Sequence, residues 1–347
     1  MKKQTISITV ILLLLCCLLC SCSSKKGELN SEGIQYAPNM PMDEMTAEIP
    51  SEKYSEIEEN QFLPTSEVSS QAFSLKVSTA AYSNVKRYLA NGALPPHDAV
   101  RTEELINYFK YDTPMTVSGE HPFSVYTEVA SSPFGHSRYM AFIRVKTQDI
   151  DVSELPPCNF TFLIDSSGSM SSYDKLPLLQ QAFSMLADTL TERDTVSIVT
   201  YAGSSEVVLD SAPGSDKDAI IGAINSLSAS GSTAGAGGIQ KAYELAQKNF
   251  KKDANNRVIL ASDGDFNVGI SNVDDLKNFI SEKRGNGIYL SVLGFGTGNI
   301  RDDIMETLAA NGNGNYSYID SLTTAQKVLI DEMGSNLFTV ADDVKAQ

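Results

Sequence analysis

From residue 159 onward, the sequence alternates regularly between strand patterns and helix patterns. The runs NFTFLID (159–165), DTVSIVTYA (194–202) and RVILASD (257–263) are rich in apolar, β-branched and aromatic residues, which indicates buried strands. Segments with apolar residues at helical spacing, such as KLPLLQQAFSMLADTL (175–190), lie between them. This alternation predicts an α/β fold of the doubly wound class, a mostly parallel sheet with helices on both faces, at residues 156–340.

Polar side chains gather where the predicted strands end. Asp165 closes the first strand and is followed by Ser167 and Ser169, while Asp263 closes a later strand. Thr233 lies in a run of small residues before a helix and can reach the same edge. Ligands of such sheets bind at the carboxyl ends of the strands. Three hydroxyls and two carboxylates form an all-oxygen set, which hard divalent cations prefer, although helix caps and turns also favour these residue types.

Two other readings of the serine cluster have little support. A serine nucleophile needs an oriented base, and the three histidines (His97, His121 and His136) all precede the predicted α/β domain. A P-loop needs Gly-Lys-Ser or Gly-Lys-Thr, which the sequence lacks. The run GFGTGN (294–299) has no third glycine at dinucleotide-binding spacing, so we interpret it as loop structure.

The motif D-x-S-x-S at Asp165, Ser167 and Ser169, with a distant Thr233 and Asp263, resembles the metal-ion-dependent adhesion site of von Willebrand factor type A domains. The resemblance covers residues 159 to about 340. It implies that Ser167, Ser169 and Thr233 ligate Mg²⁺ (or Mn²⁺ or Ca²⁺) directly, while Asp165 and Asp263 act through water or from behind the ligands. It further implies a protein partner that offers an acidic side chain to the metal.

The segment TAAYSNVKRYLANGALPPHDAVRTEELINYF (79–109) resembles the N-terminal region of a bacterial subfamily, the YfbK-type lipoproteins. It contains two helical patterns separated by Asn-Gly and Pro-Pro breakers. Two alternating, strand-like runs follow at 123–134 and 138–147. We therefore expect a small N-terminal α+β module at residues 73–155.

The beginning of the chain indicates a secretory leader. A basic MKKQ precedes an apolar stretch at residues 6–19, which is shorter than the ~20 residues that span a bilayer. LCSC follows and resembles the bacterial lipobox, so we expect a signal peptide at 1–21 and lipid on Cys22; a plain signal peptide or a signal anchor is the alternative. The acidic, Ser- and Pro-rich residues 22–72 are typical of a disordered linker.

Charge and cysteine content narrow the function. A net charge of −16 argues against nucleic acid, whose binding depends on Lys and Arg neutralising phosphates. Beyond the leader and Cys22, Cys158 is the one cysteine, which predicts a packed thiol and no disulfide framework. We expect a non-enzymatic lipoprotein of the bacterial cell envelope, membrane-anchored and binding a protein through its metal. The alternatives are a site that only stabilises the fold, or a metal-dependent hydrolase using Asp265.

Overall fold

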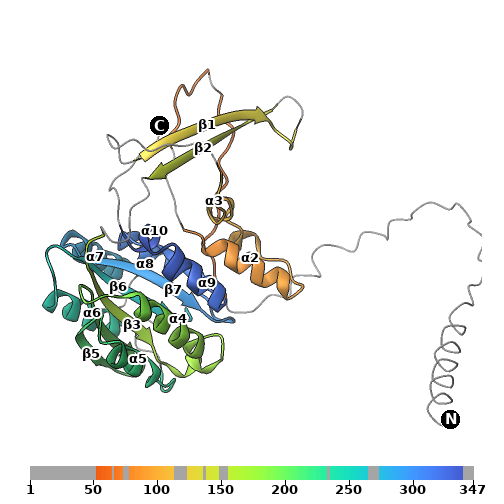
Figure 1. Cartoon of the computed structure of the whole chain (residues 1–347). Coiled ribbons are helices and arrows are strands. Elements are labelled where there is room, and N and C mark those ends of the chain that lie inside the picture. Colours follow the sequence, from red (N-terminus) through yellow and green to blue (C-terminus); the bar gives the residue numbers. More distant parts are fainter. Residues whose placement is uncertain are drawn as a thin grey trace, which may run out of the picture. The chain divides into compact units, whose positions relative to one another are not determined.

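The molecule is built around a six-stranded sheet (Figure 1). The structure is a computed structural model, and it describes residues 52–64, 66–72, 78–112, 123–135, 138–147, 155–232, 235–264 and 273–338. The strands of the central sheet are β3 (Cys158–Asp165), β4 (Thr195–Tyr201), β5 (Ser205–Pro213), β6 (Asn255–Ser262), β7 (Tyr289–Phe295) and β8 (Tyr316–Ile319).

The strand order is β5-β4-β3-β6-β7-β8, and neighbouring strands are parallel except for the pair β4 and β5. Residues 202–204 alone connect β4 to β5, and so short a connection permits a hairpin but no crossover. The predicted fold class, a doubly wound and mostly parallel α/β sheet, is confirmed.

Helices cover both faces of this sheet. They are α4 (Leu176–Thr189), α5 (Lys217–Asn225), α6 (Gly235–Lys248), α7 (Val273–Gly285), α8 (Asp302–Asn311), α9 (Leu322–Gln326) and α10 (Met333–Leu337), with a 3-10 turn η4 (Gly168–Ser171) and a π-helical turn η5 (Lys327–Asp331). The hydrophobic residues form two separate clusters, one under α4, α5 and α9 and the other under α6, α7 and α8.

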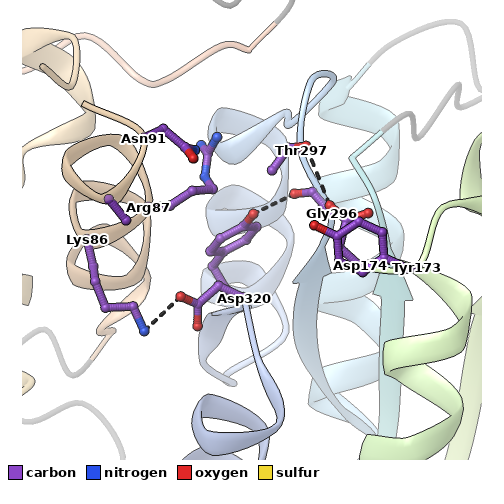
Figure 2. Close-up of a pocket in the computed structure, with 10 residues that line it drawn as sticks. Lys86, Arg87, Asn91, Tyr173, Asp174, Gly296, Thr297 and Asp320 are labelled. Atoms are coloured by element: carbon purple, nitrogen blue, oxygen red, sulfur yellow. Dashed lines mark hydrogen bonds and ion pairs between the residues drawn. The ribbon is translucent and has the colours of Figure 1, made fainter. Parts of the chain in front are cut away.

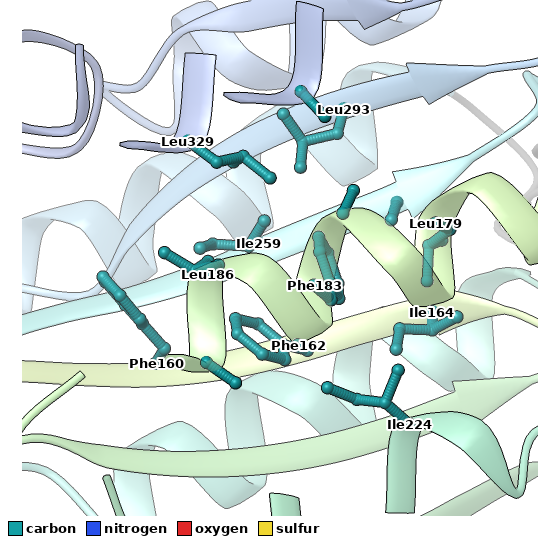
Figure 3. Packing of buried hydrophobic residues seen from close by; sticks show 14 of the residues in the cluster. Phe160, Phe162, Ile164, Leu179, Phe183, Leu186, Ile224, Ile259, Leu293 and Leu329 are labelled. Atoms are coloured by element: carbon teal, nitrogen blue, oxygen red, sulfur yellow. The ribbon is translucent and has the colours of Figure 1, made fainter. Parts of the chain in front are cut away.

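Strand β3 supplies both clusters because successive side chains of a strand point to opposite faces. Phe160, Phe162 and Ile164 pack under α4, where Phe162 lies 4.5 Å from Phe183 between ring centroids (Figure 3). Leu163 belongs to the cluster on the other face. Every residue of β3 is buried, so this strand is a rigid support for the polar residues that follow it.

The segment 324–338, whose apolar spacing predicts one helix, is divided in the structure. The Glu332 amide donates to the carbonyl of Lys327, five residues back, at 2.9 Å. The side chains of the same two residues form an ion pair. This wider turn is a π-bulge, which inserts a residue into an α-helix and separates α9 from α10.

The N-terminal region contains helices and strands, as the sequence predicts, and in the structure its two described strands pair as an antiparallel hairpin. Its elements are α2 (Ala80–Ala90), a 3-10 turn η2 (His97–Ala99), α3 (Thr102–Asn107), and the antiparallel strands β1 (Phe123–Ser131) and β2 (Tyr139–Thr147). Ala80 of α2 belongs to the same hydrophobic cluster as α6, α7 and α8. Helix α2 therefore packs on the central domain.

A buried charged group joins α3 to the start of α8. The Arg101 guanidinium donates to Glu104 Oε1 and to Asp302 Oδ2, both at 2.6 Å. The Glu104 carboxylate also accepts the Ala81 amide at 2.8 Å. The side chains of Glu104 and Asp302 are fully buried, so their charges are compensated within the protein. Arg101 is thus a buried ionic link between the N-terminal region and the central domain.

Residues Glu52–Tyr54 correct the expected extent of the linker. They fall within 22–72, where the composition predicts disorder, yet their backbone and side chains pack on the central domain. The Lys53 amide donates to the Ile300 carbonyl at 2.8 Å, and Lys53 forms an isolated parallel bridge with Arg301. The Glu52 side chain is only 1% exposed. The composition of this segment cannot show which of its many polar side chains have buried partners elsewhere in the chain.

Two further expectations concern the cysteines and the membrane. Burial, reinforced by the nearby Asp194 charge, raises the pKa of the Cys158 thiol to about 12, so this thiol stays protonated at neutral pH. Within the described ranges, no helix is both long and apolar enough to cross a bilayer. The predicted signal peptide and Cys22 lie outside the described residues.

Candidate functional site

The candidate site is built on the adjacent carboxyl ends of β3 and β6. Ile164 and Ala261 are paired in register, so Asp165 and Ser262 follow at the same level of the sheet. The Ser262 hydroxyl donates to Asp165 Oδ2 at 3.1 Å. The parallel pairing of these two strands therefore brings Asp165 and Asp263 to one edge, as the sequence predicts.

Asp165 is completely buried and held by three donors. The Ser167 amide donates to Oδ1 at 2.9 Å, and the Tyr201 hydroxyl donates to Oδ2 at 3.2 Å, in addition to Ser262. Burial raises the pKa of Asp165 to about 6; the hydrogen bonds from Ser167 and Ser262 work against this rise, and the charge of Asp263 adds to it. A carboxylate in such surroundings is stabilised by a nearby cation.

Ser167 and Ser169 direct their hydroxyls to one place. Their Oγ atoms lie 2.9 Å apart, and Ser167 is buried. The turn η4 between strand and helix produces this convergence, because it starts at Gly168 directly after the extended Ser167. The two serines at positions 3 and 5 of the motif are thus the pair that the spacing predicts.

Thr233 lies outside the described residues, but the chain just before it is fixed to the motif. The Ser230 amide donates to the Ser166 carbonyl at 2.8 Å, and the Gly168 amide donates to the Gly231 carbonyl at 3.0 Å. A Cβ atom on Gly168 would lie 3.3 Å from that same carbonyl oxygen, so a glycine suits this close approach. Asp265, the residue named for a hydrolase, also lies outside the described residues.

Asp263 has a partner that the sequence analysis did not identify. Its Oδ2 atom accepts from Lys175 Nζ at 2.8 Å, and the lysine also donates to Asn299 Oδ1 at 3.2 Å. The Asp263 side chain is fully buried and that of Lys175 is 9% exposed. Lys175 comes ten residues after Asp165 in a polar turn, and no motif spacing marks it as part of the site.

The donor chemistry fits a hard divalent cation. Within the described part of the chain, the site offers two hydroxyls and two carboxylates, and all of these donors are oxygens. No group of three or more His, Cys, Asp or Glu side chains suited to a metal occurs among the described residues. A cation here would therefore depend on the serine hydroxyls, and on Thr233 if its hydroxyl joins them.

A pocket of about 240 Å³, lined in part by charged and polar side chains, adjoins the motif turn (Figure 2). Tyr173 and Asp174, which follow the motif serines, form one wall, and Thr297 donates to Asp174 at 3.5 Å. On the other side, Lys86 of α2 pairs with Asp320 at 2.7 Å. Figure 2 shows these two pairs on opposite sides of the pocket. The N-terminal region therefore contributes to the surface beside the candidate site.

The histidines do not supply a base for the motif serines within the described structure. His97 lies on η2, is largely exposed and is next to Asp98 and Glu59. His121 and His136 lie outside the described residues.

Comparison with known proteins identifies two curated relatives. YfbK of Escherichia coli (strain K12) is 44% identical over 301 residues, which are 85% of this chain and 52% of that protein. Protein sll0103 of Synechocystis is 27% identical over 196 residues, which are 56% of this chain and 45% of that protein. The chain thus spans about half the length of these curated relatives.

Solved structures with a similar fold include BatB from Bacteroides thetaiotaomicron, which is 21% identical with a TM-score of 0.43 over 51% of this chain and 98% of that one. A von Willebrand factor type A protein from Catenulispora acidiphila is 19% identical with a TM-score of 0.44, over 60% and 48% of the two chains. Similarity at this level indicates nothing about activity or partners.

Family models match both folded regions. The model described as von Willebrand factor matches residues 48–141, and the model described as von Willebrand factor type A domain matches residues 159–331. The second range contains the whole central sheet from the second residue of β3 to β8. The chain therefore belongs to the von Willebrand factor type A domain proteins, with that domain at residues 159–331.

Proposed function

We propose that this protein binds a divalent cation at the end of β3, with Mg²⁺ as the favoured ion, and that it binds a protein partner through this cation. The observation that carries the proposal is the convergence of the Ser167 and Ser169 hydroxyls, 2.9 Å apart, beside the buried carboxylates of Asp165 and Asp263. Ser167, Ser169 and Thr233 would hold the cation directly. Asp165 and Asp263 would act through water or from behind these ligands.

The chemistry of such a site favours an acidic partner. Neutral hydroxyls leave most of the charge of a divalent cation uncompensated, and the contacts of Asp165 to Ser167, Ser262 and Tyr201 already engage both of its oxygens. Hard cations complete their shell with oxygen ligands, and carboxylates are the strongest of these in proteins. A carboxylate from a partner would therefore coordinate the cation tightly, and no covalent bond of the partner would be made or broken.

The proposed setting is the bacterial cell envelope. The basic, apolar and LCSC segments of the leader support a lipid anchor on Cys22, which would hold the protein at a membrane surface. A binding role, rather than an enzymatic one, is supported by the hydroxyl-rich donor set. A metal that only stabilises the fold is the alternative, and the following experiment separates the two.

An EDTA-sensitive pull-down tests the binding role. The full chain, bound to a resin, is incubated with a bacterial envelope extract in Mg²⁺ and then washed with Mg²⁺ or EDTA. We expect EDTA to release a protein that the Asp165→Ala variant never retains, because that variant lacks the buried carboxylate of the site. An exposed control, Asp253→Asn, should retain the partner. If every bound protein remains in EDTA, the purely structural role of the metal is favoured.

A further inference from the structure

Lys175 lies in a recess that the backbone provides for it. Gly296 has a φ of +73°, and a Cβ atom there would lie 2.2 Å from Lys175 Cγ. A residue with a side chain at position 296 would therefore displace the aliphatic part of the lysine and be strained in its own backbone. The loop after β7, residues 296–301 (the β7–α8 loop), is thus shaped to place the Lys175 ammonium on Asp263.

The β7–α8 loop also packs against the residue that follows Asp263. Gly264 has a φ of +98°, and a Cβ atom there would lie 2.6 Å from the Arg301 amide nitrogen and 2.9 Å from the Asn299 carbonyl oxygen. Asn299 further accepts from Lys175 Nζ at 3.2 Å. A shift of this loop would therefore move both the lysine and the backbone beside Asp263.

The N-terminal segment Glu52–Tyr54 (the latch) contacts the backbone of the β7–α8 loop. The Gly298 amide donates to Glu52 Oε1 at 3.1 Å, and the Lys53 amide donates to the Ile300 carbonyl at 2.8 Å. These contacts join residues nearly 250 positions apart, so the latch is a tertiary contact that the chain can release without breaking any strand.

Glu52 is itself firmly fixed. Its Oε2 atom accepts from Arg87 Nη2 at 2.7 Å and from the hydroxyls of Tyr54 and Tyr88, both at 2.9 Å. Burial works to raise the pKa of Glu52, but the hydrogen bond and charge of Arg87 and the amide of Gly298 outweigh burial and hold it below its ordinary value. Glu52 is therefore a buried anion that connects α2 to the β7–α8 loop.

We propose that Lys175 is a tethered cation that competes with the divalent metal for Asp263, and that the latch sets the strength of this competition through the β7–α8 loop. The proposal rests on the metal-dependent function above and adds its regulation. A divalent cation next to Asp263 is repelled by the ammonium group, which lies 2.8 Å from the same carboxylate. Release of the latch would let Lys175 withdraw, and the affinity for the metal would rise.

The coupling works in both directions. If release of the latch strengthens metal binding, metal binding must loosen the latch by the same free energy. The latch directly follows the N-terminal segment that would lead to the lipid anchor. Tension on that segment, or binding of another molecule to it, would then change the affinity of the site for the metal.

Calorimetric titration with Mg²⁺ alone tests this proposal on the full chain. We expect Lys175→Met to bind Mg²⁺ about tenfold more tightly than the wild type, which is within the usual range of coupling between sites. Glu52→Gln should bind about threefold more tightly, a smaller effect than that range, because it acts on the lysine only through the loop. Glu58→Gln is the matched control, since Glu58 is exposed and lies just after the latch, and the Mg²⁺ affinity of this variant should not change. Glu52→Gln should add nothing in the Lys175→Met background, because the latch acts through the lysine.

Hydrogen exchange supplies a readout that does not depend on the Lys175 variant. Addition of Mg²⁺ to the wild type should speed exchange of the Lys53 and Gly298 amides, which the latch protects. Suppose that the wild type binds Mg²⁺. Unchanged exchange of these amides would then overturn the latch proposal alone, and so would a Lys175→Met variant that binds Mg²⁺ no more tightly than the wild type. Absence of Mg²⁺ binding in the wild type and in all variants would overturn the proposed function with it.

Discussion

Arg101→Met is expected to lower the free energy of unfolding by about 3–5 kcal/mol, the cost of removing one partner of a buried ionic group. The substitution leaves Glu104 and Asp302 as two fully buried carboxylates without the cation that both contact at 2.6 Å. Met fills a similar volume, so the loss would arise from charge rather than from a cavity. Urea denaturation followed by circular dichroism measures the change.

Arg284→Met is the control for this prediction. Arg284 is exposed near the end of α7, and an exposed substitution usually changes stability by less than about 0.5 kcal/mol. Limited proteolysis adds a local readout, because loss of the Arg101 link should expose the N-terminal region to cleavage before the central domain unfolds. If Arg101→Met and Arg284→Met unfold at the same urea concentration, Arg101 does not hold the two regions together.

Asp263→Asn is expected to have the second largest effect, and to act on both stability and metal binding. In EDTA, it leaves the Lys175 ammonium buried without an anionic partner, with only neutral side-chain oxygens as acceptors, which should cost about 3 kcal/mol. In Mg²⁺, the variant should show none of the rise in melting temperature that a bound ligand gives the wild type. Thermal and urea melts with and without Mg²⁺ measure the two effects separately.

A double-mutant cycle separates the charge pair from the metal. Asp263→Asn combined with Lys175→Met removes both charges, so it should recover most of the stability lost in EDTA while still failing to respond to Mg²⁺. The exposed substitution Asp253→Asn should behave like the wild type. A full Mg²⁺ response in Asp263→Asn would show that this carboxylate lies outside the metal site.

The sequence predicts the central fold well because its signals are local. Strand β3 shows them most clearly: a short run rich in aromatic and β-branched residues, flanked by polar residues and followed by a helical pattern, indicates a buried strand. The π-bulge at Lys327–Asp331 is harder to predict from the sequence, because one inserted residue hardly changes the apolar spacing. The packing of Glu52 could not be predicted, since its partners Arg87 and Gly298 are remote in sequence.

The candidate site is predicted in part for the same reason. Asp165, Ser167 and Ser169 form a compact motif, and parallel strands must bring Asp263 to the same edge. The sequence does not predict that Lys175 belongs to the site, since a lysine in a polar turn is normally solvated. Its burial depends on the recess at Gly296, which lies in GFGTGN, and the pattern of that run predicts only a loop. The position of Lys175 therefore depends on the backbone shape at Gly296, which residue types alone do not reveal.

Calorimetric titration of Mg²⁺ into Ser167→Ala/Ser169→Ala shows whether the motif hydroxyls hold a divalent cation. Each lost ligand should cost at least ~1.4 kcal/mol, so the double variant should bind about a hundredfold more weakly than the wild type. Ser171→Ala/Ser172→Ala, in the exposed part of the same turn, is the matched control and should bind like the wild type. Equal Mg²⁺ affinity in all three proteins would show that the motif hydroxyls do not hold the metal.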